Sequence, residues 1–195
     1  MKNVKSAVVP LFPLPDFFLY PGTVAPLHIF EARYRQMVND LLDGPGRLVI
    51  ASLIKRAPRQ PGMPAPVFPI GTLAEIIRHE KLPEGRFLIV LAGLTRVKVA
   101  EVASDRLYRK VQVEPLASVE GDEATARLLR PRLEVALREQ AGRTVDLDDD
   151  LPIGHLADLL LHCLELTPEQ NEEMLAELDA ARRARMALAW HAAQA

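Results

Sequence analysis

The sequence predicts an α+β protein in which a β-rich half, residues 1–116, precedes a helical half, residues 117–195. Apolar residues alternate in short runs up to about residue 113 and then recur at spacings of three and four. Glycine and proline turns separate the runs of the first half. The charge changes at the same place. Residues 1–116 hold 16 Lys+Arg and 10 Asp+Glu, a net of +6, and residues 117–195 hold 8 and 16, a net of −8. We therefore expect two subdomains.

The first elements alternate between extended chain and helix. Val8–Leu14 is apolar but contains two prolines, which favours an extended or edge segment over a central strand. After a turn at Pro21-Gly22, Val24–Ile29 is expected to be extended. Phe30–Leu42 changes period and predicts a helix with one apolar face. The residues of that face are Phe30, Tyr34, Met37, Val38 and Leu41.

Short strands joined by tight turns fill the rest of the first half. Arg47–Ile54 is a nearly continuous apolar run, typical of a buried strand. Lys55–Pro66 contains four prolines and is predicted to be a surface loop. Four further strands are expected: Val67–His79, Arg86–Leu91, Thr95–Val102 and Arg109–Val113. This pattern indicates a closed or strongly coiled antiparallel sheet rather than a parallel one.

The second half reads as helices. A helix is expected from Asp122 onward, with a kink or a break at Pro131. After an acidic connector, Ile153–Leu164 predicts an apolar-rich helix. Thr167-Pro168-Glu169-Gln170 has the pattern of a capping box, and Asp179 is expected to cap a last helix that runs to about His191.

The bulk composition is that of a soluble globular protein, with 49% hydrophobic and 26% charged residues. The apolar run after Lys2 and Lys5 is short and interrupted by prolines, so we expect neither a signal peptide nor a membrane span. The single cysteine, Cys163, excludes an intramolecular disulfide and suits a reducing compartment. We therefore expect a cytoplasmic protein.

No constellation of residues predicts catalysis, a metal or a cofactor. Phosphate-binding and dinucleotide-binding glycine motifs are absent, and no serine lies in a nucleophile motif. His155, Asp158 and His162 share one helix face, but the histidines lie about 10 Å apart along a helix, too far for one ion. The cluster Asp146, Asp148, Asp149 and Asp150 lacks the pattern of a calcium loop. Cys163 is expected to be a small buried hydrophobic residue.

Nucleic acid is an unfavoured partner. Lys55, Arg56 and Arg59 form a basic loop that could contact phosphates. Aromatic residues make up only 5% of the chain, and none interleaves with these basic residues to stack on bases.

The N-terminal motifs resemble the opening of the Lon N-terminal domain, and more closely the stand-alone bacterial proteins built from that domain alone. They are Val9-Pro-Leu-Phe-Pro-Leu-Pro15, Phe18-Leu-Tyr-Pro-Gly22 and Ala25-Pro-Leu-His-Ile-Phe-Glu-Ala-Arg-Tyr-Arg35. The similarity continues through Pro69–Ile77 and Leu91–Val97 into the helical half at Leu166–Gln170. The resemblance therefore covers almost the whole chain.

The resemblance implies a PUA-like β-barrel with an inserted helix, followed by a C-terminal α-helical bundle. It also implies a non-catalytic module that binds unfolded or extended polypeptides, as an adaptor or chaperone-like factor, with an ATP-dependent protease as a candidate partner. The ATPase loop and the Ser-Lys protease domain of full-length Lon are absent from the sequence, so no enzymatic activity is expected. RNA binding through the barrel is the alternative. The candidate polypeptide contacts are Phe30, Glu31, Arg33, Tyr34 and Met63.

Overall fold

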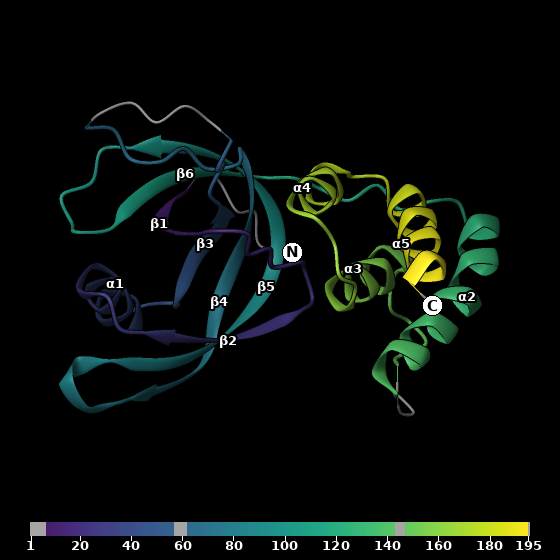
Figure 1. The fold of residues 1–195 in the computed structure, drawn as a ribbon, viewed down its shortest axis with the longest axis horizontal. Coiled ribbons are helices and arrows are strands. Elements are labelled where there is room, and N and C mark those ends of the chain that lie inside the picture. Colours follow the sequence, from purple (N-terminus) through teal and green to yellow (C-terminus); the bar gives the residue numbers. More distant parts are fainter. Residues whose placement is uncertain (1–6, 57–61, 143–146, 195) are drawn as a thin grey trace. The chain divides into compact units, whose positions relative to one another are not determined.

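The computed structural model describes residues 7–56, 62–142 and 147–194. These residues form two compact units, 1–116 and 117–195. The first unit contains a six-stranded sheet and the helix α1, and the second contains the helices α2 to α5 (Figure 1). The α+β class predicted from the sequence is therefore confirmed.

The sheet of the first unit is built from six strands in the order β2-β5-β4-β3-β1-β6. The strands are β1 (Ala7–Leu14), β2 (Val24–Ile29), β3 (Arg47–Ser52), β4 (Ile70–Lys81), β5 (Phe87–Val102) and β6 (Arg109–Pro115). β5 also pairs with β6, so the pairings β5-β4-β3-β1-β6 run in a ring, and β2 is added to β5 outside that ring. All the pairings are antiparallel except that of β1 with β3.

Two predictions about the strands are wrong. β1 is not an edge strand, because it pairs with β6 over Ala7–Leu11 and with β3 over Leu11–Leu14. Each proline of β1 lies where only one side of the strand is paired, so its missing N–H can face the unpaired side. β5 is one strand rather than two, because Gly93 lies within it and hydrogen-bonds to the turn at Gly22-Thr23.

Two apolar clusters hold the first unit together. One cluster contains one side chain or more from each of the five ring strands: Leu11, Val49, Ala51, Leu73, Val97, Val111 and Val113. The other joins β2 and the first part of β5 to α1 (Ala32–Leu42) through Tyr34, Met37, Val38 and Leu41. The apolar face predicted for this helix is confirmed at these four positions. Phe30 is the exception, since the helix begins only at Ala32.

The second unit contains α2 (Glu123–Ala141), α3 (Ile153–Cys163), α4 (Pro168–Ala176) and α5 (Ala180–Gln194). Both predicted caps are present: Thr167 and Gln170 form a capping box, and Asp179 accepts from two N–H groups of α5. Asp122, which was not predicted as a cap, accepts from the Thr125 N–H. The helix α2 continues through Pro131, so the helix is not split there, and a kink at Pro131 stays a prediction.

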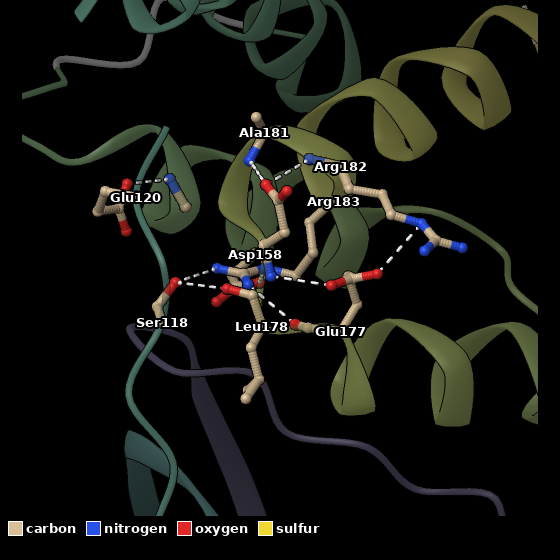
Figure 2. A network of polar contacts seen from close by, with 10 residues as sticks. Ser118, Glu120, Asp158, Glu177, Leu178, Ala181, Arg182 and Arg183 are labelled. Carbon is tan, nitrogen blue, oxygen red and sulfur yellow. Dashed lines mark hydrogen bonds and ion pairs between the residues drawn. The ribbon is translucent and has the colours of Figure 1, made fainter. Parts of the chain in front are cut away.

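A buried ion pair lies at the centre of the second unit (Figure 2). Arg183 Nε donates to the Asp158 carboxylate at 3.0 Å, and both side chains are almost fully buried. The remaining guanidinium nitrogens donate to the Glu177 carbonyl and the Ser118 hydroxyl. Because Ser118 lies before α2, Arg183 links the entry segment of this unit to α3 and α5.

Candidate functional site

The strand β2 ends the pairing order and leaves one of its edges unpaired. It pairs with β5 from Val24↔Ala92 to Ile29↔Phe87, and no other strand in the described part of the chain pairs with it. An unpaired strand edge presents a row of backbone N–H and C=O groups. A further extended chain can therefore form hydrogen bonds at this edge.

The side chains of β2 alternate between the core and the solvent. Ala25 and Ile29 are buried in the cluster that includes α1, whereas Val24, Pro26 and His28 are exposed. A period of two is expected of a strand that is buried on one face. The buried side chains therefore hold β2 against the core, while the side chains on its other face are exposed to solvent.

A small apolar cavity lies beside the second half of β2, and we call it the β1–β2 slot. Its volume is about 130 Å³. It is lined by side chains of β1, β2 and the start of α1: Phe12, Leu14, Leu27, His28, Ile29, Phe30, Glu31 and Tyr34. An apolar protein cavity of roughly 150 Å³ holds a benzene ring. The slot therefore matches one leucine or phenylalanine side chain.

The wall of the slot is formed by two aromatic rings in contact. The ring centroids of Phe12 and Tyr34 lie 4.3 Å apart at an angle of 45°. Burial raises the pKa of the Tyr34 hydroxyl above its usual value. Because tyrosine is already neutral near pH 7, this shift keeps the wall uncharged over a wider pH range.

The rim of the slot combines an exposed aromatic ring with a balanced ion pair. Phe30 is 61% exposed, and its ring lies 5.8 Å from the ring of His28. Arg33 pairs with Glu31 at 2.7 Å, and its guanidinium lies 4.7 Å from the Tyr34 ring centroid. The rim therefore offers apolar surface and no net charge.

Four of the five residues predicted as polypeptide contacts come together here. Phe30, Glu31 and Tyr34 line the slot, and Arg33 stacks on Tyr34. Met63 is 66% exposed but does not line the slot. That these side chains contact a polypeptide stays a prediction.

A second hollow, which we call the outer groove, lies over β2, β5 and β4 and has a volume of about 410 Å³. It shares Leu27 and His28 with the slot. Its other lining residues are Pro26, Arg78, His79, Glu80, Leu88, Ile89 and Val90. The edge strand β2 is thus bordered by two apolar hollows.

The second unit contains an apolar groove of its own, between α2 and α5, with a volume of about 400 Å³. Pro131, Val135 and Leu188 contribute its apolar surface. At one end His191 Nε2 lies 2.8 Å from a carboxylate oxygen of Glu139. This groove is a second candidate surface for apolar ligands.

The contributions of Phe12, Leu14 and Leu27 were not predicted from the sequence. All three read as ordinary core residues, because the slot exists only where the end of β1 comes close to β2. The period of two across Val24–Ile29 is the one local signal of a half-exposed strand, and it does not show that the strand lies at an edge.

One of the residues considered for metal binding, Asp158, forms a buried ion pair with Arg183. Among the described residues, no group of three or more His, Cys, Asp or Glu side chains could hold a metal ion. In the acidic connector, Asp146 lies outside the described residues.

Cys163 is exposed, so the prediction that it is buried is wrong. It is the last residue of α3, and its neighbour His162 is exposed as well, whereas Leu161 and Leu164 are buried. The apolar face of the helix therefore leaves the pair His162-Cys163 outside.

The basic loop gives no support to a phosphate-binding surface. Lys55 forms an ion pair with Asp16, and Arg56 also has an interaction partner. Arg59 lies outside the described residues. None of the described helices is both long enough and apolar enough to cross a membrane.

The sequence matches a family model described as the ATP-dependent protease La (LON) substrate-binding domain over residues 8–190. The chain is 24% identical to the Lon protease of Anaeromyxobacter dehalogenans, over 93% of this chain and 22% of that protein. It is 26% identical to the Lon protease of Trichlorobacter lovleyi, over 90% of this chain and 22% of that protein. The chain thus spans less than a quarter of the length of these relatives.

Two solved structures share the fold. The N-terminal domain of the Mycobacterium avium complex Lon protease superposes with a TM-score of 0.72 at 21% identity, covering 95% of this chain and 98% of that one. A Lon N-terminal domain protein from Xanthomonas campestris superposes with a TM-score of 0.68 at 24% identity, covering 94% and 98%. At this level of identity the likeness concerns the fold alone.

Proposed function

The chain belongs to the family of substrate-binding domains of ATP-dependent protease La (LON), and on this premise we propose that it is a non-catalytic module that binds unfolded or extended polypeptides. The resemblance noted in the sequence is confirmed by the family match. A substrate-recognition role of the Lon type follows from membership. The module's surface, clients and partners are our proposal.

The observation that carries the proposal is the combination of hollows around β2. The slot and the outer groove are lined mainly by apolar side chains, and the exposed Phe30 stands at the rim. Exposed apolar surface that is concave and bordered by polar groups is typical of a binding site. Unfolded polypeptides expose the apolar side chains that such a surface can bury.

We assign the module the role of an adaptor or chaperone-like factor in the cytoplasm, with an ATP-dependent protease as a candidate partner. The matched region in the relatives is a substrate-binding domain. A domain with the same fold could hold an unfolded chain for such a protease. Two basic side chains of unit 1–116, Lys55 and Arg109, each pair with a carboxylate, and neither is therefore an unpaired contact for RNA phosphates.

We also interpret the ring of pairings β5-β4-β3-β1-β6 as the PUA-like barrel that the resemblance implies. The supporting observation is the apolar cluster to which all five strands contribute, since side chains that point into a closed sheet pack together. In this interpretation β2 and α1 are additions to the barrel that form the slot.

The proposal is tested by measuring the affinity of the protein for one model protein in two states. A reduced and alkylated protein that cannot refold is labelled and titrated in fluorescence anisotropy, and its native form is the matched control. We expect saturable binding of the unfolded form and none of the native form. Equal binding of both forms, or of neither, would contradict the proposed function.

RNA serves as the competing ligand in the same assay. A labelled single-stranded RNA is expected to bind weakly at low salt and to be released near physiological salt, as a non-specific charge effect would be. Tight RNA binding that survives physiological salt would favour the alternative function.

A further inference from the structure

We propose that the free edge of β2 takes up a segment of the client as an additional β-strand, and that one apolar side chain of this segment enters the β1–β2 slot. This inference rests on the proposed polypeptide-binding function and specifies how the client is held. Strand addition supplies affinity through backbone hydrogen bonds, and a pocket for alternate side chains supplies selectivity.

The slot lies where two strands both have an unpaired edge. The pairing of β1 with β6 ends at Leu11, so Phe12–Leu14 is paired with β3 alone. β2 is paired with β5 alone. Phe12 and Leu14 line the slot from one side and Leu27 and Ile29 from the other. The slot is therefore an opening beside unpaired backbone, rather than a depression over a completed sheet.

Pro26 indicates which backbone groups of β2 face the free edge. It is paired with Val90 of β5 but has no N–H to donate. Where proline occurs in an edge strand, the side on which its N–H would point faces away from the paired strand. N–H groups alternate in direction along a strand, so residues two positions apart point to the same side. The N–H groups of Val24 and His28, two residues before and after Pro26, therefore face the free edge. The His28 N–H is thus the donor next to the slot.

The occupant that fits this edge is an extended, locally uncharged segment of an unfolded chain. Successive side chains of an added strand point to opposite faces. One side chain can then enter the slot while its neighbours lie on the outer side, near Pro26 and His28. Since Glu31 and Arg33 neutralise one another at the rim, no unpaired charge favours an ionic side chain in the slot.

A second copy of this chain fits the edge less well. Edge-to-edge pairing of two β2 strands would place a proline in each of two six-residue strands. Proline on an edge strand is a common device that prevents such pairing. A client strand without proline leaves only one gap in the ladder of hydrogen bonds.

The first test uses the wild-type protein and short peptides with one central leucine among threonines. One peptide carries N-methyl groups on the leucine and every second residue, and its matched control carries them on the residues between. Only one of these sets of amides can face β2 when the leucine is in the slot. We expect one N-methylated peptide to bind like the unmodified one and the other to bind about tenfold more weakly. Equal affinities of the two N-methylated peptides would overturn the proposal.

The second test changes the protein. His28→Pro removes the N–H beside the slot, and His28→Val is the control that removes the imidazole but keeps the N–H. We expect His28→Pro to bind the unmodified peptide about tenfold more weakly than His28→Val, because both variants lack the imidazole and only His28→Val keeps the N–H; the thermal unfolding midpoint is measured for both. Equal affinities of two folded variants would overturn the proposal. A concentration-dependent dimer that is lost in His28→Pro would also overturn it, by assigning the edge to a second copy.

Polypeptide binding and strand addition at β2 can be refuted independently. If the alkylated unfolded protein binds but the N-methylated peptides do not differ, polypeptide binding stands and strand addition is wrong. If the alkylated protein does not bind, the proposed function itself is wrong.

Discussion

Removing the carboxylate from the buried ion pair Asp158–Arg183 is expected to destabilise the helical unit without affecting the β1–β2 slot. The two side chains are only 3% and 1% exposed, and Arg183 Nε lies 3.0 Å from an Asp158 carboxylate oxygen. In Asp158→Ala the guanidinium would stay buried and keep its hydrogen bonds to the Glu177 carbonyl and the Ser118 hydroxyl. Leaving one charge of a buried pair without its partner costs about 3–5 kcal/mol.

This cost is a large part of the stability of a small domain, which is roughly 5–15 kcal/mol. With a urea dependence of about 2 kcal/mol per molar, the unfolding midpoint should fall by about 2 M. The fluorescence of Trp190 reports on this unit, because it is the only tryptophan of the chain and lies on α5. Urea titrations of the wild type and the variant measure the shift.

Two controls separate a buried charge from a general loss of contacts. Glu123→Ala breaks the exposed ion pair with Arg127 on α2 and should change stability by only about 0.5 kcal/mol. The double variant Asp158→Leu/Arg183→Met removes both charges and should be more stable than Asp158→Ala. A loss below about 1 kcal/mol in Asp158→Ala would refute the reasoning. We expect peptide binding to survive, since all slot residues belong to residues 12–34.

Three further predictions concern the first unit. Replacing the peptide's central leucine with alanine removes three carbons, worth about 2.4 kcal/mol. The affinity of the peptide for the protein, measured by fluorescence anisotropy, should therefore fall roughly fiftyfold. A loss below threefold would mean that the leucine does not enter the slot. Gly93→Ala would place a Cβ against the Tyr20 carbonyl and 3.3 Å from Thr72 Cγ2. The urea midpoint of this unit, followed by circular dichroism, should therefore fall by the equivalent of about 1–3 kcal/mol. An unchanged midpoint would contradict this close packing around Gly93. Burial and the hydrogen bond to Asp40 raise the pKa of Tyr108 to about 12, so its contribution to stability should be complete below pH 10 and be lost as the pH rises through 12. Tyrosinate absorbance should show one tyrosine fewer ionising late in Tyr108→Phe than in the wild type, and a Tyr108 that ionises near pH 10 would contradict it.

Local signals in the sequence predicted the helices and their ends well. The capping box at Thr167 and the cap at Asp179 depend on residues two or three positions apart, and both are present. The apolar face of α1 follows from spacing alone at Tyr34, Met37, Val38 and Leu41. Such features were predictable because the interactions that form them are close in sequence.

The errors arose where distant segments decide the outcome. β1 appeared to be an edge strand because its prolines cannot donate, yet it has a partner on each side over different parts of its length. Gly93 appeared to end a strand, yet it allows the turn at Tyr20–Thr23 to approach β5 within one long strand. Cys163 appeared suited to the core, yet it belongs to the outer side of the last turn of α3.

The candidate site was predictable only in part. The resemblance selected Phe30, Glu31, Arg33 and Tyr34, which the fold gathers around one slot. The contributions of Phe12 and Leu14 depend on where the pairing of β1 with β6 ends, and no local pattern encodes that point. The exposure of Phe30 depends on the helix starting at Ala32 rather than two residues earlier.

Site-specific photo-crosslinking would show most directly where an unfolded client binds. A photoreactive phenylalanine analogue is introduced at Phe30 beside the slot or, as the control, at Leu128 on α2, which is 68% exposed. Each protein is then irradiated with the alkylated unfolded protein. We predict a strong crosslink from position 30 that an excess of the leucine peptide suppresses, and little from position 128. An equal crosslink from both positions, or one from position 128 alone, would contradict a binding site at β2.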